Sequence, residues 1–488
     1  MDFTAPTGER GRLTAQLAAN TIVQAVGSML AAAIGFFTFV AMTRGLGPEG
    51  FGDFAAAMAF LFIPVAIADV GLSAAVLREI STTPERTEPA MRASLPLRAL
   101  VSAVVMALSV GVGVALPFNE QTTVAVLIGS LGSFMTLMSL ALLPVLQAQL
   151  RMHWAVAGNV AGRLVTLAGT LGAFAVGLGF QAIVWAYVAG LAVTFAIHLV
   201  GVARVVPLGP VIDRAYWRTL VVGSLVIGLA IAISQVYFRI DTLLLALIRS
   251  SEEVGYYGAA YKFIELAQFT SSAVAISMFP PLASFLAAGD PRARELVQKA
   301  FDVLIASAAF VAVLMLAFPE EIIGFTAGSE FREAAPALQL LAPFVFFGFV
   351  NGVFFRVLLA SRRDTELFLA SGGVLVLNVA LNVALIPVYG YKAAAVVLVV
   401  TEALVLLPLA VVISSEGLLP NLRYAPLVAL AAGVLSVIVW LVPGPAAVVG
   451  VLGGVVYSAI LVAAPGTVQE AARSLAAGRP RLHLRARP

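Results

Sequence analysis

Long apolar runs follow one another along the whole chain, separated by short stretches rich in Pro, Gly and charged residues. Because the hydrocarbon core of a bilayer is about 30 Å thick, an α-helix needs roughly 20 apolar residues to cross it. The pattern therefore predicts fourteen membrane spans, at 15–42, 51–77, 99–118, 122–147, 155–178, 182–203, 219–248, 255–287, 301–318, 335–360, 367–388, 392–413, 425–442 and 446–464.

The composition excludes the other broad classes of protein. Hydrophobic residues make up 61% of the 488 positions and charged residues 11%, whereas a soluble protein carries about 25% charged residues. A soluble enzyme and a disordered chain are excluded on these grounds, and a disulfide-rich secreted domain is excluded because the chain has no cysteine. We expect an all-α integral membrane protein with about 14 transmembrane helices.

The positions of Lys and Arg predict the orientation. If the N-terminus is placed inside, twenty-one basic residues fall in the N-terminal segment, the inner loops and the C-terminal tail, and Arg98 is counted among the loop residues. Four fall outside: Arg44, Arg249, Arg332 and Lys392. An excess of this size in short loops is a positive-inside signal. We expect a multi-pass protein of the plasma or inner membrane with both termini in the cytoplasm.

An internal repeat divides the chain. Residues 48–57 (PEGFGDFAAA) match 251–260 (SEEVGYYGAA), and 179–182 (GFQA) match 390–393 (GYKA), in each case at equivalent span boundaries. The pattern predicts two pseudo-symmetric six-helix lobes in one orientation, at 1–205 and 206–418. Spans 13 and 14 follow at 419–465, and a basic cytoplasmic tail at 466–488. The alternative is chance similarity among apolar segments.

Ionisable residues inside the predicted spans are costly, about 2.5–3.5 kcal/mol each at a helix centre. The sequence places eight there: Asp69, Arg163, Arg239, Asp241, Lys262, Glu265, Arg356 and Glu402. Mutual neutralisation explains some of them, because Lys262 and Glu265 are three residues apart on one helical face. Arg239 and Asp241 are two residues apart, so we expect them to point to different faces.

Polar residues at helical spacing accompany these charges. They form predicted stripes in four spans: Asn159, Arg163, Thr166 and Thr170; Gln235, Arg239 and Thr242; Asn20 and Gln24; Asp69 and Ser73. Stripes in several spans indicate a hydrated central cavity, and the alternative is that the polar groups hold helices together.

Arginine would dominate the chemistry of such a cavity. Its planar, always-charged guanidinium matches phosphate and carboxylate groups, and Arg163 and Arg239 are expected to meet an anionic head group from one lobe each. We take the substrate-binding candidates to be Arg163, Arg239, Asn20, Gln24, Lys262, Gln235 and Asn159. The candidates for coupling or gating are Asp69, Asp241, Glu265 and Glu402, with Asp69 or Glu402 as a lone buried proton carrier.

No enzyme, metal or cofactor signature is visible in the sequence. The three histidines are scattered at spacings that do not suit a metal, and the chain contains no Walker A motif. The sequence therefore predicts a transporter without a cofactor.

Several motifs resemble a known family. Gly45–Gly52 (GLGPEGFG), Asp69–Leu72 (DVGL) and Arg78–Ile80 (REI) are similar to the opening of polysaccharide-repeat flippases. The second half adds Asp241–Leu245 (DTLLL), Glu253–Tyr261 (EVGYYGAAY) and Asn382–Tyr391 (NVALIPVYGY). These are the O-antigen and capsule transporters of the multidrug/oligosaccharidyl-lipid/polysaccharide exporter superfamily. The chain departs from the family at Ala393, where Gly is usual.

The resemblance implies a flippase for surface polysaccharide biosynthesis. Such a protein would carry a polyprenyl-diphosphate-linked oligosaccharide from the inner to the outer leaflet by alternating access, with membrane lipids, a polysaccharide polymerase and glycosyltransferases as partners and without nucleic acid. A peptidoglycan lipid-precursor flippase and a cation-coupled multidrug antiporter of the same superfamily are alternatives, as is a non-transport scaffold.

Overall fold

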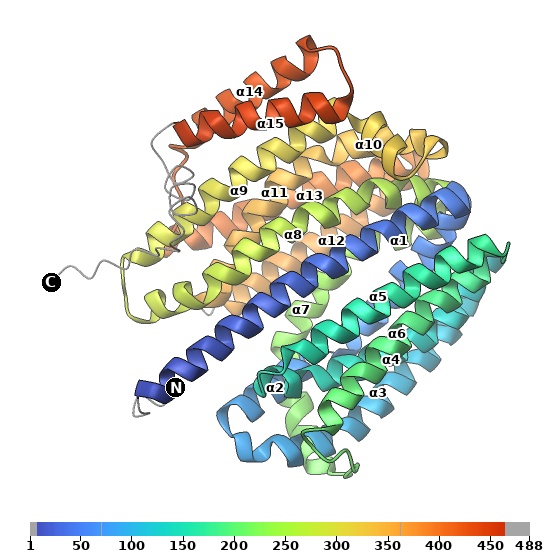
Figure 1. The fold of residues 1–488 in the computed structure, drawn as a ribbon, viewed down its shortest axis with the longest axis vertical. Coiled ribbons are helices and arrows are strands. Elements are labelled where there is room, and N and C mark those ends of the chain that lie inside the picture. Colours follow the sequence, from blue (N-terminus) through green and yellow to red (C-terminus); the bar gives the residue numbers. More distant parts are fainter. Residues whose placement is uncertain (1–6, 70, 362, 464–488) are drawn as a thin grey trace. The chain divides into compact units, whose positions relative to one another are not determined.

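The computed structural model describes residues 7–69, 71–361 and 363–463, and within them the chain is built from helices (Figure 1). The predicted tail at 466–488 lies outside the described residues. The helices are α1 (Thr7–Asp69), α2 (Leu72–Thr82), α3 (Thr87–Ala115), α4 (Glu120–Ala148), α5 (Met152–Ala175), α6 (Phe180–Ala203), α7 (Arg214–Ile248), α8 (Ser251–Ala287), α9 (Arg292–Ala317), α10 (Pro319–Thr326), α11 (Ala335–Ala360), α12 (Asp364–Tyr389), α13 (Tyr391–Ser415), α14 (Ala425–Leu441) and α15 (Ala446–Ala463).

The all-α membrane fold is confirmed. Every predicted span overlaps a helix. Ten helical stretches of the described residues are long and apolar enough to cross a bilayer, and one shorter apolar helix, Ala425–Leu441, accompanies them. The total of fourteen spans remains a prediction.

The first two predicted spans form one element, α1, with a sharp kink. Gly47 has φ 67° and ψ −178°, a conformation that costs a glycine little and other residues much. Pro48 follows at once, where its missing N–H and fixed φ suit the first turn of a new helix. A second glycine, Gly71 with φ 70°, separates α1 from α2.

Arg98 was counted among the loop residues between the second and third predicted spans, and that placement was wrong. The segment is largely helical, with α2 ending at Thr82, a 3₁₀ turn at Pro84–Arg86 and α3 beginning at Thr87. Arg98 therefore lies inside α3, where it is 2% exposed. Hydropathy alone misses such a helix, because its first turns carry polar residues that the tertiary structure buries.

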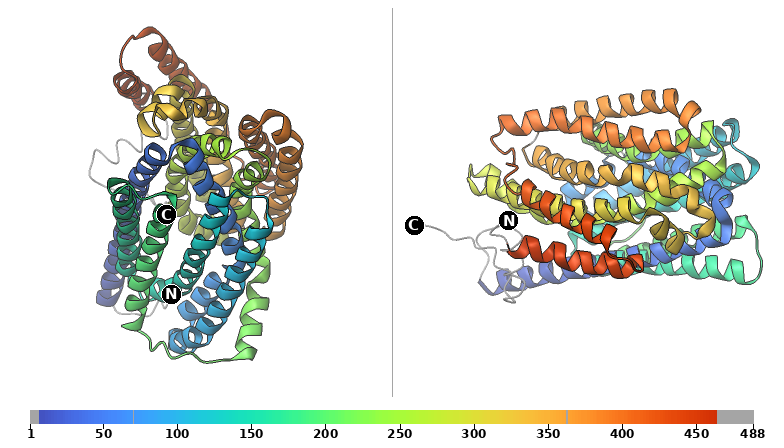
Figure 2. Two further views of the ribbon diagram at one scale, coloured as in Figure 1. Left: turned by 90° about the vertical axis from the view of Figure 1, so that its right-hand side faces the viewer. Right: turned by 90° about the horizontal axis from the view of Figure 1, so that it is seen from above.

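The chain forms two compact units, Met1–Gly258 and Ala259–Pro488. These units are defined by internal contacts and not by the sequence repeat, so the lobes predicted at 1–205 and 206–418 remain a prediction. In the first unit α5 packs on α6, α6 on α4 and α4 on α3 (Figures 1 and 2). In the second, α11 packs on α9 and α13, and the α14–α15 hairpin is tied to α9 because Tyr457 Oη donates to the Ala306 carbonyl at 2.7 Å.

A reciprocal glycine contact joins the two copies of the repeat motif inside the first unit. A Cβ on Gly52 would lie 1.7 Å from the Ser251 carbonyl oxygen, and a Cβ on Gly255 would lie 2.0 Å from the Pro48 carbonyl oxygen. Gly52 corresponds to Gly255 in the repeat, and Pro48 to Ser251. An exchange of this kind is what a two-fold relation between equivalent segments produces.

Because both glycines face backbone atoms, a methyl group at either position would overlap a carbonyl oxygen. We expect Gly52→Ala and Gly255→Ala each to destabilise the protein by about 1–3 kcal/mol through overpacking. A lower melting temperature in detergent, followed by fluorescence-detected size exclusion, would report this effect. Gly111→Ala is the matched control, since that helical glycine has open space around it. Equal melting of all three variants would contradict the tight crossing.

Candidate functional site

Arg163 lies on the surface of the first unit, at the contact between α5 and α1. Its side chain is exposed, and a Cβ on Gly35 of α1 would lie 2.3 Å from its Nη1 atom. The glycine thus leaves room for the guanidinium beside the α1 backbone. Among the described residues, no hydrogen bond or ion pair neutralises Arg163.

Arg239 on α7 belongs to the same unit. It is half-exposed, and its guanidinium carbon lies 5.2 Å from the centre of the Phe62 ring, within the range of a cation–π interaction. Both guanidinium groups lie within electrostatic range of Tyr187 on α6. Tyr187 in turn packs edge-on against Phe54, with ring centres 5.6 Å apart. We call Arg163, Arg239, Tyr187, Phe54 and Phe62 the arginine–tyrosine cluster.

Both arginines lie in the first compact unit, because α7 packs against α1. The assignment of one arginine to each predicted lobe remains a prediction. Two permanent cations within electrostatic range of one phenol create a positive site. Such a site suits an anion with several oxygen acceptors.

Four of the other predicted substrate residues are polar and uncharged. Asn159, Gln235 and Gln24 are exposed, on α5, α7 and α1. Asn20 has a structural role as well, since its Oδ1 accepts from the Met152 amide at 3.3 Å at the beginning of α5. An oxygen in that position satisfies one of the amides that a helix start leaves unpaired.

The predicted polar stripe on α5 does not form one surface. Asn159 and Arg163 are exposed, whereas Thr166 and Thr170 are buried. A Cβ on Gly190 of α6 would lie 2.1 Å from Thr166 Oγ1, so this threonine fills the space beside a glycine at a close helix crossing. Spacing predicts a common face, but the neighbouring helix decides which part of that face stays open.

Asp69 is not the lone acid that the sequence suggested. Its Oδ1 accepts from Arg98 Nη1 at 2.6 Å and from Ser73 Oγ at 2.7 Å, and Arg98 Nη2 also donates to Ser73 Oγ at 2.8 Å. The pair lies beside the break at Gly71, where a Cβ would meet Gly228 of α7 at 3.0 Å. Asp69 and Arg98 therefore stabilise the packing around a helix break.

The remaining acidic candidates lie in different surroundings. Asp241 is 1% exposed and accepts from Tyr257 Oη at 3.4 Å. Glu265 pairs with Lys262 at 2.8 Å, as the sequence predicted. Glu402 is buried in the second unit and accepts from Asn351 Nδ2 at 2.9 Å. A coupling role for any of these acids stays a prediction.

Sequence reasoning missed a buried acid in the repeat motif. Asp53, 1% exposed, accepts from Asn119 Nδ2 at 2.7 Å, from Thr122 Oγ1 at 2.9 Å and from Ser251 Oγ. The sequence did contain a sign of this residue, because Asp53 is an acid within the repeat motif at the beginning of the second predicted span. Tyr187 gave no signal, because a tyrosine in an apolar run is ordinary. Within the described part of the chain, no group of three His, Cys, Asp or Glu residues could hold a metal ion.

Family models match two overlapping parts of the chain. The family model of polysaccharide biosynthesis proteins matches residues 17–286, more than half of the chain. This chain belongs to the polysaccharide biosynthesis protein family. A second model, MatE, matches residues 227–384 of this family member. The resemblance to the polysaccharide flippases of the exporter superfamily is thereby confirmed.

Relatives of this polysaccharide biosynthesis protein are transporters. A "Probable low-salt glycan biosynthesis flippase Agl15" of Haloferax volcanii is 26% identical over 398 residues, which is 78% of this chain and 80% of that one. Among solved structures, the lipid II flippase MurJ in an inward closed conformation has a TM-score of 0.76 at 14% identity, with 90% of this chain and 98% of that chain covered. An inward-facing multidrug transporter of the MATE family has a TM-score of 0.65 at 15% identity, with 82% and 99% covered. These structures share the fold.

The electrostatic coupling between Asp69 and Arg98 can be tested by mutation. Asp69→Asn leaves the buried Arg98 as an uncompensated charge, so we expect it to cost about 3 kcal/mol, whereas Arg98→Gln leaves the partly exposed Asp69 and should cost less. The double variant should cost less than the sum, as a double-mutant cycle of detergent unfolding would measure. Glu265→Gln, in a pair that is 28% exposed on both sides, is the control and should cost under about 1 kcal/mol. Additive losses at Asp69 and Arg98 would refute the coupling.

Proposed function

We propose that this protein moves a polyprenyl-diphosphate-linked oligosaccharide from the inner to the outer leaflet of the cell membrane, for surface polysaccharide biosynthesis. The observation that carries the proposal is the arginine–tyrosine cluster, in which Arg163 lies exposed beside Gly35 and Arg239 lies over the Phe62 ring within one membrane-spanning unit. Family membership and the glycan flippase relative support the choice of substrate class.

The diphosphate is the part of the substrate that the two arginines suit. A guanidinium binds a phosphate through two parallel N–H···O bonds and stays charged at every physiological pH. The Tyr187 hydroxyl can donate a further bond to a bridging or terminal oxygen. Asn159, Gln235 and Gln24 are exposed and could bind sugar hydroxyls, while the polyprenyl chain remains in lipid.

A cationic drug would need an unpaired acid, and two of the acidic candidates are each paired with a base. Asp69 is paired with Arg98, and Glu265 with Lys262. Arg163 has no such partner among the residues that the structure describes. In the first unit Asp69 is thus neutralised whereas Arg163 is not, and this contrast favours an anionic cargo at Arg163 over the cation of a multidrug antiporter.

The membrane potential can supply the direction of transport. With the cytoplasm negative by 100 mV, outward movement of each negative charge is favoured by about 2.3 kcal/mol. A diphosphate can then move outward without nucleotide hydrolysis. We propose alternating access between the two predicted lobes as the mode of transport, with a polymerase and glycosyltransferases as partners.

Loss of the two guanidinium groups should abolish most of the transport. In vesicles that contain a polyprenyl diphosphate with a fluorescent sugar, we expect Arg163→Gln with Arg239→Gln to slow translocation at least about ten-fold, because charge-assisted hydrogen bonds are lost. Quenching by membrane-impermeant dithionite measures the rate. Arg78→Gln, exposed on α2, is the matched control.

An unchanged rate in the double variant would remove the basis of the proposal. The same vesicles, loaded instead with a peptidoglycan lipid precursor or a cationic dye, separate the two alternatives. Faster transport of either cargo than of the polyprenyl-linked oligosaccharide would reassign the function.

The proposed orientation can be tested directly, because the chain has no cysteine. We place both termini in the cytoplasm, which puts Thr82 at the end of α2 inside and Val176 between α5 and α6 outside. Both side chains are exposed. An impermeant maleimide should label Val176→Cys on intact cells, and Thr82→Cys only after permeabilisation. The reverse pattern would invert the topology.

A further inference from the structure

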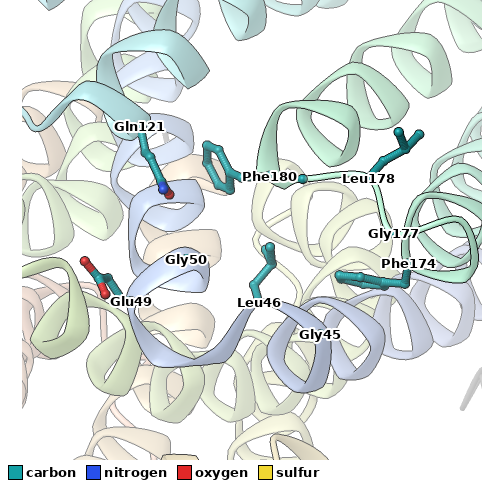
Figure 3. Close-up of a pocket in the computed structure, with 10 residues that line it drawn as sticks. Gly45, Leu46, Glu49, Gly50, Gln121, Phe174, Gly177, Leu178 and Phe180 are labelled. Carbon is teal, nitrogen blue, oxygen red and sulfur yellow. The ribbon is translucent and has the colours of Figure 1, made fainter.

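A cavity of about 400 Å³ opens at one end of the first unit, away from any role assigned above (Figure 3). It lies where the α1 kink, the beginning of α4 and the α5–α6 turn meet. Its main side chains are Leu46, Glu49, Gln121, Phe174, Leu178 and Phe180, and glycines form much of the remaining wall. The volume falls within the range of small-molecule sites.

The cavity unites two motifs that the arginine–tyrosine cluster leaves unexplained. Gly45, Leu46, Glu49 and Gly50 come from the GLGPEGFG segment, and Gly179 and Phe180 come from the GFQA segment of the repeat. The first motif carries the family resemblance, and both mark the internal repeat. Their convergence on one cavity gives the motifs a common location.

The glycines shape the cavity. The left-handed φ of Gly47 turns the chain so that Glu49 stands on the rim. A Cβ on Gly45 would lie 2.1 Å from Phe174 Cζ, so the absent side chain lets the phenyl ring lie against the α1 backbone. Gly179 begins α6 without a side-chain cap, which leaves the first amides of that helix to other acceptors.

The polar groups of the cavity are exposed and available to a ligand. Among the described residues, neither Glu49 nor Gln121 has a hydrogen bond or an ion pair. In Figure 3 both stand at one side of the cavity, with Phe180 and Phe174 on other sides. The two phenylalanines are half-buried, so each ring keeps part of its face accessible.

We propose that this cavity is a binding subsite for a sugar ring. A carboxylate accepts hydrogen bonds from two neighbouring hydroxyl groups, a primary amide both donates and accepts, and an aromatic face attracts the apolar C–H face of the ring. A phosphate is disfavoured because Glu49 would repel it. A lipid tail is disfavoured because it would leave the carboxylate and the amide without partners.

The inference rests on the proposed function and extends it. With the orientation proposed above, the α5–α6 turn faces outward, so the subsite lies on the side where the head group leaves. A sugar held there after translocation would be kept from returning. The subsite would thus bind the glycan, while the arginine–tyrosine cluster binds the diphosphate.

Binding can be measured without transport, on the full chain in lipid nanodiscs. Saturation-transfer difference NMR with glucose, galactose and N-acetylglucosamine should show transfer to the ring protons of at least one sugar. The open-chain sorbitol, which has hydroxyls but no ring face, should show much less. We expect Glu49→Gln and Gln121→Ala each to raise the dissociation constant of that sugar about ten-fold, because a hydrogen-bonded group is lost.

The matched control is Glu252→Gln. Glu252 is the counterpart of Glu49 in the repeat, does not line the cavity and accepts from Tyr256 Oη at 2.6 Å. This variant should bind like the unaltered protein. No transfer from any of the three sugars, or transfer that Glu49→Gln and Gln121→Ala leave unchanged, overturns the subsite. Sugar binding without translocation would instead defeat the proposed function and leave the subsite standing.

Discussion

The cost of a charge in hydrocarbon decides what each ionisable residue of this chain can do. A charge inside a membrane-spanning helix must be paired, hydrated or close to an end. Asp69 with Arg98 and Lys262 with Glu265 meet this condition by pairing. Arg163, exposed on α5 beside Gly35 and without such a partner among the described residues, meets it only if water or a ligand reaches it. The pairing pattern thus separates structural charges from those available for binding.

Glycine makes this distribution of charge compatible with a packed bundle. Helices in a membrane gain little from the hydrophobic effect against one another, so small residues that allow close approach matter more than in water. Gly52 and Gly255 bring the two copies of the repeat motif into backbone contact, and Gly162 and Gly190 do the same for α5 and α6. Gly35 and Gly45 differ from these, since each leaves room for one side chain, Arg163 or Phe174, beside the α1 backbone.

Under the proposed function, the two sites would bind different parts of one substrate. The arginine–tyrosine cluster provides permanent positive charge and few neutral acceptors, which suits a diphosphate. The cavity around Glu49 and Gln121 provides an acceptor, an amide and aromatic faces, which suits an uncharged sugar ring. Opposite electrostatic character in one compact unit would let a head group leave the first site as its sugar enters the second.

The sequence by itself determined the membrane class, the approximate helix positions and the family. These follow from apolar runs, from the repeat and from motifs such as GLGPEGFG, all of which are local in the chain. It also predicted the Lys262–Glu265 pair, because a three-residue step on a helix fixes the distance. Only the tertiary structure decided that Arg98 is buried with Asp69, that Thr166 packs while Arg163 stays open, and that Tyr187 lies near both arginines. Each of these depends on which neighbouring helix covers a face, and helical periodicity carries no information about that neighbour.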